Sequence, residues 1–431
     1  MKFKGKQVLV YGLGDSGRAV SKILKEKGAI VSLFDDDLKY LEYVGFERNP
    51  FDKTFDLVVL SPGVKINGNK LLEHFNSQRI PVISEIDFGY IFAKGKLIAI
   101  TGTNGKTTTS MLTYKILKGA GYKTFLCGNI GLPFSSIAQK TTRKSVVVCE
   151  VSNFQLESSK FFRANVSAVL NLAPDHLDRH GSFEEYKRVK ALIAKNIKDK
   201  DILIVNYDDE NTKNMFLHKK TEFFSKNTLK KGVFCKNNQI FINKKSILSL
   251  STIKLKGEKN LENVLASIAI CKYFHVSNQE IERAVSNFVP ASHRMEIVGK
   301  RNGVTFVDDS KATNLSSTIA CVEAFKNKRK ILLMGGLGKE IDYADFFSQK
   351  PNLKKLICFG SDGQKIFDCA KSFEMDVEVF DKFEDAVKFS NQIAEEGDFV
   401  LLSPACASFD EFSSYAERGD KFKEIVLEDS Q

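Results

Sequence analysis

The run IAITGTNGKTTT, from Ile98 to Thr109, limits the possible folds of this chain more than any other segment. An apolar stretch typical of a buried strand leads into a glycine-containing loop, and a lysine followed by hydroxyl residues then begins a helical pattern. In such a segment the glycines let backbone N–H groups face phosphate oxygens, the lysine adds positive charge, and the first hydroxyl can ligate Mg²⁺. The segment predicts an α/β domain that binds the phosphates of ATP.

The spacing of this loop differs from the usual Walker pattern, because only two residues separate Gly102 from Gly105. The alternative interpretation is a strand-to-helix turn that contains glycine and lysine by chance. The order of strand, loop and helix favours the phosphate site. The residues expected to contact ATP here are Gly102, Thr103, Asn104, Gly105, Lys106, Thr107 and Thr108.

Composition narrows the class of protein. The chain has 431 residues, of which 43% are apolar, so it can bury the cores of several domains, and we expect three. The net charge is +11, but basic residues are interspersed with acids and show no nucleic-acid signature. Eight cysteines without a CxxC pair indicate free thiols in a reducing compartment, and no segment reaches membrane-spanning length. We expect a monomeric, cytoplasmic protein that acts on small molecules, without nucleic-acid or membrane partners.

Strand and helix patterns alternate along the chain and predict an α/β fold of three domains. Residues 1–92 fit an N-terminal Rossmann-like domain. Residues 93–290 fit a central P-loop ATPase domain with a parallel sheet, although the pattern is weak in the lysine-rich stretch near 218–260. Residues 291–431 fit a C-terminal Rossmann-like domain.

The sequence GLGDSG follows the first apolar strand pattern and fits the dinucleotide fingerprint, with Asp35 to Asp37 after the second strand, where an acid would bind a ribose. Two interpretations remain open. The first is a nicotinamide dinucleotide, and the second is another nucleotide whose phosphates lie against the turn from Gly14 to Ser16. An ATP site elsewhere and the lack of hydride-transfer residues favour the second.

Polar residues follow two strand patterns of the central domain. Glu150 ends SVVVCE, while Asp175 and His176 follow VSAVLNL. Because the carboxyl ends of parallel strands lie at one edge of a sheet, these side chains could meet the Lys106 loop and hold a second Mg²⁺. The alternative for His176 is that it caps a helix beginning near Ser182.

Other polar residues of the central domain are less distinctive. The pattern does not single out Lys190, which fits one of several solvated lysine positions on a helix over residues 183–194. Ser152 and Asn153 follow a strand end and are placed to contact substrate. Gln155 also fits an exposed polar position.

In the last domain, two strand ends carry groups suited to anions or nucleotides. The first, VDDSKATN, contributes Asp309, Ser310, Lys311 and Thr313. The second, LLSPACASFDEF, ends a strand at Ser403, and we expect a helix to begin near Ser408, with an N-terminus that binds a carboxylate. A turn with a capping residue is the alternative at each end.

Six segments, GTNGKT, NLAPDHLDRHG, GEKNLENVLA, SHRME, DDSKATN and LSPACASFDEF, occur in this order and together resemble the Mur ligases of bacterial peptidoglycan synthesis. The resemblance spans all three expected domains. It implies ATP-dependent ligation of D-glutamate to UDP-N-acetylmuramoyl-L-alanine through an acyl phosphate, with ATP and two Mg²⁺ sites. A Mur-type ligase for another amino acid and a nucleotide-gated binding module without ligation are the alternatives.

The resemblance also implies roles for single residues, among which Lys106, Glu150, His176 and Lys190 would be catalytic. The implied magnesium ligands are Thr107, Glu150, His176 and Lys190, the last as a carbamate. Further positions that match ATP contacts are Asn263, Arg294 and Asp309. Positions that match substrate contacts are Ser16, Asp35, Asn129, Ser152, Asn153, Gln155, Lys311, Thr313, Ser408, Phe409 and Tyr415. The family often has leucine and phenylalanine at the last two, so we expect an altered amino-acid pocket that still prefers D-glutamate.

Overall fold

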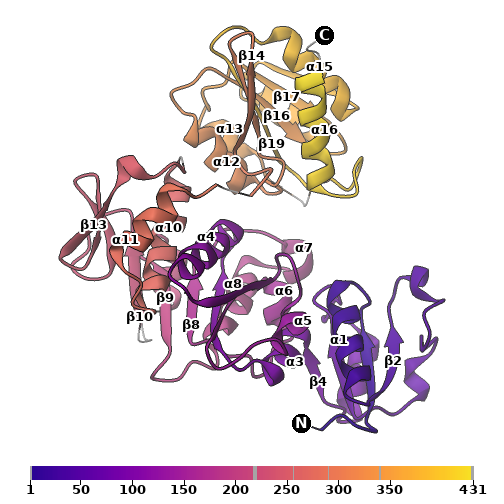
Figure 1. Ribbon diagram of the computed structural model, residues 1–431. Helices are drawn as coiled ribbons and strands as arrows, with labels where there is room; N and C mark the ends of the chain where they lie inside the picture. Colours follow the sequence, from indigo (N-terminus) through magenta and orange to yellow (C-terminus); the bar gives the residue numbers. More distant parts are fainter. Residues whose placement is uncertain (1, 217–220, 256, 290, 339–340, 429–431) are drawn as a thin grey trace. The chain divides into compact units, whose positions relative to one another are not determined.

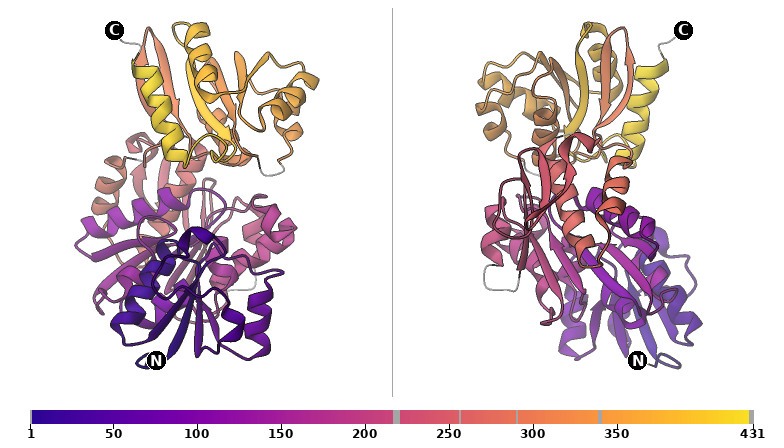
Figure 2. Two further views of the ribbon diagram at one scale, coloured as in Figure 1. Left: turned by 90° about the vertical axis from the view of Figure 1, so that its right-hand side faces the viewer. Right: turned by 60° about the vertical axis from the view of Figure 1, so that its left-hand side comes forward.

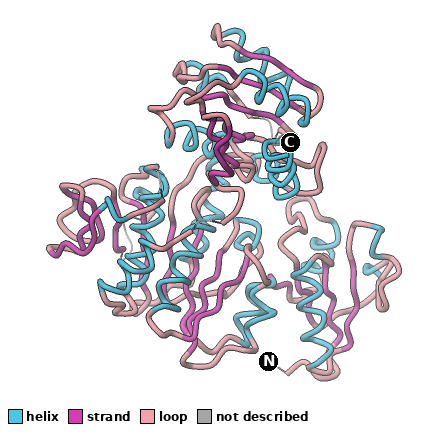
Figure 3. The backbone as a smooth tube through the Cα atoms, turned by 45° about the horizontal axis from the view of Figure 1, so that its top comes forward, coloured by secondary structure: helices cyan, strands magenta, loops and turns pink. Residues whose placement is uncertain are grey.

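The structure is a computed structural model that describes residues 2–216, 221–255, 257–289, 291–338 and 341–428. The chain forms two compact units. The first is built from Met1–Pro174, Ser182–Lys254 and Glu262–Phe288, and the second from Asp175–Gly181, Leu255–Leu261 and Val289–Gln431. Figure 3 shows strands with helices packed along them, which confirms the predicted α/β class. Among the described helices, none combines the length and apolar character that a membrane crossing requires.

The N-terminal sheet of the first unit is parallel, in the order β2-β1-β3-β4. Its alternating side chains face two cores, since Val8 and Val10 pack with helices α1 and α3, while Leu9 packs with α2. Figure 1 shows α1 and β2 in indigo. The elements are β1 (Gln7–Tyr11), α1 (Asp15–Glu26), β2 (Ile30–Phe34), η1 (Leu38–Tyr40), η2 (Pro50–Asp52), β3 (Leu57–Leu60), α2 (Lys70–Ser77), β4 (Val82–Ser84) and α3 (Glu85–Phe92).

A second sheet follows, in the order β13-β12-β11-β10-β9-β8-β5-β7-β6. Its strands are parallel from β6 to β11, and β12 and β13 add an antiparallel hairpin at one edge. The elements from 93 to 200 are β5 (Lys96–Thr101), α4 (Lys106–Gly119), β6 (Lys123–Gly128), α5 (Phe134–Ala138), β7 (Ser145–Glu150), α6 (Asn153–Glu157), β8 (Val166–Val169), α7 (Leu177–His180), α8 (Phe183–Ala191) and η3 (Leu192–Ala194). The remaining elements are β9 (Ile202–Asn206), α9 (Glu210–Met215), β10 (Thr221–Ser225), β11 (Val233–Lys236), β12 (Gln239–Ile242), β13 (Lys245–Ser249), η4 (Leu250–Thr252), α10 (Glu258–Lys272) and α11 (Asn278–Ser286).

A carboxylate joins the N-terminal sheet to this second sheet within the first unit. Asp87, at the start of α3, is buried and accepts hydrogen bonds from the backbone N–H groups of Lys160, Phe161 and Phe162 at 2.7 to 3.0 Å. It also accepts from the Ser159 hydroxyl. These bonds fix the segment before β8 against α3, so the two sheets pack as one unit.

The second unit contains a sheet in the order β14-β15-β19-β16-β17-β18, parallel except for β14. Helices α15 and α16 pack with one core and α12 to α14 with the other, and Figure 2 shows α16 in yellow along the sheet. The elements are β14 (Glu296–Arg301), β15 (Val304–Asp308), α12 (Leu315–Ala324), β16 (Lys330–Gly335), α13 (Ala344–Ser348), β17 (Lys355–Phe359), α14 (Gly363–Ser372), β18 (Val377–Phe380), α15 (Phe383–Ile393), β19 (Phe399–Ala405) and α16 (Tyr415–Glu428).

One predicted element is wrong, because no helix begins near Ser408. The backbone N–H groups of Glu411 and Phe412 bond to the Ser408 carbonyl in a turn, and α16 begins only at Tyr415. The hydroxyl that caps the helix belongs to Ser414, which accepts from the N–H of Glu417 at 3.2 Å. Ser408 therefore lies in a loop after β19.

Candidate active site

The predicted strand, loop and helix of the phosphate site are confirmed, with β5 ending at Thr101 and α4 beginning at Lys106. Gly105 has a φ of 80°, and a Cβ at this position would lie 2.1 Å from Asn263 Oδ1 on α10. Only glycine fits both the left-handed backbone and this approach. Asn263, which the resemblance implies in ATP binding, therefore lies directly against the loop.

Asn171 holds the loop in place and was missed by sequence reasoning, although it begins the NLAPDH segment. Its side-chain oxygen accepts from the Asn104 N–H at 2.9 Å, and its side-chain nitrogen donates to the Asn104 carbonyl at 3.1 Å. Its own carbonyl accepts from the Thr103 N–H. The Thr103 hydroxyl in turn contacts the Tyr186 hydroxyl at 3.1 Å. The loop is thus preorganised by the segment after β8, the strand that lies beside β5 in the sheet.

The interpretation of Lys190 as a solvated lysine is wrong. The residue is 0% exposed on α8, because the positions that share its helical face, such as Tyr186, also pack inward. Its ammonium donates to Thr101 Oγ1 at 3.1 Å and to the Gly102 carbonyl at 3.0 Å. Lys106 Nζ donates to the same Gly102 carbonyl at 2.8 Å. The structure therefore brings two lysines together at the phosphate loop.

Glu150 ends β7 as predicted and is 2% exposed. Its Oε1 accepts from Asn129 Nδ2 at 2.9 Å, whereas its Oε2 is buried with no hydrogen-bond partner among the described residues. A buried carboxylate oxygen of this kind is suited to a divalent cation. Thr107, in the first turn of α4, offers a second buried oxygen. These residues fit a magnesium site.

Ser152, Asn153 and Gln155 are buried, so the expectation that Gln155 is an exposed polar residue is wrong. Ser152 is the N-cap of α6, with its hydroxyl accepting from the Gln155 N–H. The Gln155 side chain accepts from the Ser152 N–H at 2.9 Å in return. This capping box holds the end of β7, where Glu150 lies, in a fixed direction.

A cavity of about 570 Å³ within the first unit is lined by loops of the N-terminal sheet and, from the central sheet, by the loop after β6 and by α6. It brings together four predicted substrate residues, namely Ser16, Asp35, Asn129 and Gln155. The first turn of α1 opens into it, which presents backbone N–H groups to an anion. Asp15, Asp35, Asp36 and Asp37 line it, and of the described residues that line it none is a lysine or arginine. The Asp35 carboxylate accepts from the Leu13 N–H, so it also shapes the glycine turn.

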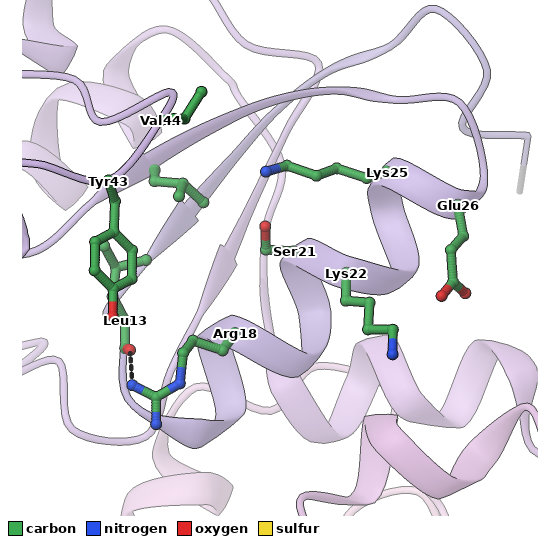
Figure 4. Close-up of a pocket in the computed structure, with 9 residues that line it drawn as sticks. Leu13, Arg18, Ser21, Lys22, Lys25, Glu26, Tyr43 and Val44 are labelled. Carbon is green, nitrogen blue, oxygen red and sulfur yellow. Dashed lines mark hydrogen bonds between the residues drawn. The ribbon is translucent and has the colours of Figure 1, made fainter.

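A second hollow lies on the other side of α1 and is shown in Figure 4. Arg18 lies beside Tyr43, and its guanidinium donates to the Leu13 carbonyl at 3.3 Å. Lys22 and Lys25 also line this hollow. None of the predicted site residues is among the described residues that line it.

In the second unit, Asp309 follows β15 and is buried, 6% exposed. Its carboxylate accepts from the Ser403 hydroxyl at 2.8 Å and from the Met295 N–H at 3.2 Å. Burial raises its pKa to about 7, although these hydrogen bonds and the nearby Arg294 guanidinium act in the opposite direction. Asp309 and Arg294, both expected near ATP, therefore lie close together.

The residues expected near the amino acid also lie in the second unit. Lys311 donates to the Tyr415 hydroxyl at 2.9 Å, and its ammonium lies 4.5 Å from the centre of the Tyr415 ring. Thr313 lies two residues further along the same loop. Ser408 is buried after β19, and the next residue, Phe409, is 69% exposed. The side of this sheet where the parallel strands have their carboxyl ends thus presents polar groups from two strand ends, those of β15 and β19.

His176 belongs to the second unit, so its place relative to Lys106 stays a prediction. It has a φ of 53° and precedes α7, with its N–H bonded to Asp175 Oδ1 at 3.0 Å. The alternative that His176 caps the helix near Ser182 is wrong, because the Ser182 hydroxyl itself caps α8 through the Glu185 N–H.

Three features define an ATP-dependent ligase fold: the parallel sheets, the glycine loop after β5 and the buried Glu150 at the end of β7. The chain belongs to the Mur ligase family. Two family models match it, the Mur ligase middle domain over residues 100–271 and the Mur ligase, glutamate ligase domain over residues 293–406. Two relatives are each called UDP-N-acetylmuramoylalanine--D-glutamate ligase. The protein from Thermoanaerobacter sp. is 37% identical and that from Alkaliphilus metalliredigens 38% identical, each over 99% of this chain and 99% of the relative.

Solved structures share the fold at lower identity. A pseudomurein peptide ligase type C from Methanothermus fervidus has a TM-score of 0.65 and 20% identity, covering 99% of this chain and 100% of that chain. The UDP-N-acetylmuramate-alanine ligase of Thermotoga maritima has a TM-score of 0.63 and 18% identity, with the same coverage. The predicted three-domain Mur ligase fold is confirmed by these similarities.

Proposed function

We propose that the chain is an ATP-dependent ligase that joins D-glutamate to the L-alanyl carboxylate of UDP-N-acetylmuramoyl-L-alanine, a step of peptidoglycan precursor synthesis. The observation that carries this function is the match, along 99% of the chain, to relatives with that name. The family uses ATP and Mg²⁺ and acts on small molecules. The cytoplasmic location and the monomeric state stay predictions.

The reaction needs an activated carboxylate, because a carboxylate is a poor acceptor for an amine. The γ-phosphoryl group of ATP passes to the alanyl carboxylate, the D-glutamate amine attacks the acyl carbon, and phosphate leaves with the electron pair of the C–O bond as the amine loses a proton. Phosphoryl transfer depends on positioning and positive charge. Lys106 and the N–H groups of Gly105 and of the first turn of α4 through Thr108 supply both.

Mg²⁺, when bound, would neutralise the charge of the phosphates. Thr107 and Glu150 would hold it through buried oxygens, and we assign His176 and a carbamylated Lys190 to a second site. The buried Oε2 of Glu150, which has no hydrogen-bond partner among the residues that the structure describes, supports the first site.

Carbamylation of Lys190 joins its neutral amine to CO₂ with release of a proton, and converts a cation into an anion. The shared Gly102 carbonyl supports this, since two ammonium groups at one oxygen repel each other and a carbamate would instead attract Lys106. We expect ¹³C NMR with labelled bicarbonate to show a carbamate signal that Lys190→Arg lacks. A wild-type protein without such a signal would contradict the carbamate while leaving the ligase assignment intact.

The three substrates would meet different parts of the chain. UDP would occupy the 570 Å³ cavity of the domain at 1–92, beside Ser16, Asp35, Asn129 and Gln155, with Ser152 and Asn153 toward the sugar. ATP would bind the domain at 93–290 together with Asn263, Arg294 and Asp309. The amino acid would bind the domain at 291–431, at Lys311, Thr313, Ser408, Phe409 and Tyr415.

Phosphate release from ATP tests the function. UDP-N-acetylmuramoyl-L-alanine is supplied with D-glutamate, L-glutamate, L-alanine or no amino acid. We expect turnover that requires both the muramyl nucleotide and D-glutamate. Faster turnover with another amino acid would assign the chain to a different Mur-type specificity, and nucleotide binding without turnover under any condition would leave only a binding module.

A further inference from the structure

Arg418, in the first turn of α16, is a buried cation at the edge of the C-terminal sheet. It is 0% exposed, and burial lowers its pKa to about 10. Within the described part of the chain its guanidinium makes five hydrogen bonds, all to carbonyl or hydroxyl oxygens. These acceptors are Ser310 Oγ at 3.0 Å, Ser310 O at 2.9 Å, Gly335 O at 3.4 Å, Cys406 O at 3.0 Å and Ala407 O at 3.2 Å.

The acceptors come from the carboxyl ends of three adjacent strands. Ser310 follows β15, Gly335 ends β16, and Cys406 and Ala407 follow β19. These loops lead directly into the residues expected to bind the amino acid. Lys311 is next to Ser310, and Ser408 is next to Ala407. One side chain therefore joins the loops on which the amino-acid pocket depends.

A further link runs through Ser310. Its hydroxyl donates to the Tyr415 carbonyl at 2.8 Å while accepting from Arg418 Nε. Tyr415 in turn accepts from Lys311 through its hydroxyl. Displacement of the guanidinium would therefore release the start of α16 and the loop after β15 together.

Stability alone does not account for an arginine here. A buried cation costs free energy when removed from water, and none of its five acceptors is a carboxylate. What arginine adds is geometry, because its planar fork presents several N–H donors in fixed directions and can hold carbonyls from three loops at once. A point charge such as lysine cannot reach all of them.

We propose that Arg418 is a positioning residue for the amino-acid substrate, fixing the loops after β15, β16 and β19 so that Lys311, Thr313 and Ser408 form one pocket. This role rests on the proposed function and adds a residue that the resemblance does not assign. Arg418 acts through those loops and does not itself contact the reacting atoms.

Lys330 offers a matched control at the opposite end of β16. It is also buried, and among the described residues its ammonium donates only to the carbonyls of Phe325, Lys326 and Lys328 at 2.9 to 3.3 Å. Both residues are thus buried cations that donate to carbonyl oxygens beside the ends of strands of one sheet. Only Arg418 lies at the edge that carries the expected pocket.

The test compares Arg418→Lys, Arg418→Met and Lys330→Met by phosphate release, varying ATP, UDP-N-acetylmuramoyl-L-alanine and D-glutamate separately, with the melting temperature of each variant. We expect both Arg418 variants to raise the KM for D-glutamate about tenfold or more, with the other two KM values within about twofold. Lys330→Met should lower the melting temperature and leave all three KM values unchanged.

The inference is overturned if the three KM values rise together, or if Lys330→Met changes the D-glutamate KM as much as the Arg418 variants do. Should the Arg418 variants not fold, Ser310→Ala removes the Nε acceptor and the Tyr415 link with a small side chain. It should raise the D-glutamate KM about threefold or more, and an unchanged KM would overturn the inference as well. A wild-type protein that turns over only with another amino acid refutes the D-glutamate assignment, and the same KM comparison with that amino acid then decides the role of Arg418.

Discussion

Replacing Asp309 with asparagine should stabilise the second unit at alkaline pH and change much less at acidic pH. The carboxyl group is buried, and burial raises its pKa to about 7. Asparagine can keep both contacts, since its oxygen accepts from the Met295 N–H and its amide donates to the Ser403 hydroxyl. The substitution therefore removes a buried charge and little else.

The magnitude follows from the two pKa values of this group. In the unfolded chain an aspartate titrates near pH 4, about three pH units below the value in the folded protein. Between these values the folded protein binds a proton that the unfolded chain has lost, so stability falls as the pH rises through this window. The complete effect corresponds to about 4 kcal/mol, of which about 2 to 3 kcal/mol is lost between pH 5 and pH 8.

Native-state hydrogen exchange can measure this difference, because the amides of β15 and β19 report the opening of the sheet that holds Asp309. We expect the free energy of opening of Asp309→Asn minus that of the wild type to increase by about 2 to 3 kcal/mol from pH 5 to pH 8. Asp381→Asn, an exposed position in the same unit, is the control and should give a constant difference. A constant difference for Asp309→Asn too would refute the reasoning.

Three further substitutions test contacts of the first unit. Asp87→Ala leaves three backbone N–H groups, that of the buried Phe162 among them, without their acceptor and should cost about 3 kcal/mol; Asp87→Asn keeps one oxygen and should cost less, and calorimetry that finds equal melting temperatures would contradict this. Gly105→Ala places a Cβ against Asn263 and should weaken ATP binding about tenfold by titration calorimetry, with circular dichroism unchanged; undiminished affinity would show that the loop tolerates the side chain. Asn171→Ala removes both side-chain bonds to Asn104 and should weaken ATP binding about fivefold, so an affinity equal to that of the wild type would exclude the clamp.

The sequence predicted well those features that depend on residues close together in the chain. The phosphate loop and the position of Glu150 at a strand end follow from residues that are neighbours in sequence, so their patterns are complete within a short window. The strands between 221 and 249 were not predicted, because they are short and lie in a lysine-rich stretch with a weak pattern. A turn signal was present, since Asn237 and Asn238 both have positive φ in the tight turn between β11 and β12.

Nearby alternatives limited the prediction of helix starts. The segment after β19 contains Ser408, Ser413 and Ser414, and each is a chemically acceptable N-cap. In the structure Ser414 is the N-cap, since its hydroxyl accepts from the Glu417 N–H, while the Glu417 carboxylate accepts from the Ser413 N–H at 2.8 Å. The spacing of serine and glutamate does not separate the candidates, because Glu411 lies three residues after Ser408 just as Glu417 lies three residues after Ser414.

The sequence analysis did not predict that Lys190 and Arg418 are buried. Their positions on helices could have indicated it. Lys190 follows Tyr186 by four residues and Val189 by one on the inward face of α8, and Arg418 precedes Phe422 by four residues on that of α16. A charged residue inside an apolar helical stripe marks a position where packing alone would choose otherwise.

A charged residue inside an apolar stripe predicts that the charge is buried, but it does not predict what the charge does. Lys330 is buried in the same way, yet its partners lie at the amino end of β16, whereas those of Arg418 lie at the carboxyl ends of β15, β16 and β19. Ligands of parallel sheets bind at the carboxyl ends of the strands. The end of the sheet at which each side chain lies therefore distinguishes Arg418 from Lys330. It depends on strand order, which a single sequence does not contain, so the functional difference between Lys330 and Arg418 emerges only from the folded chain.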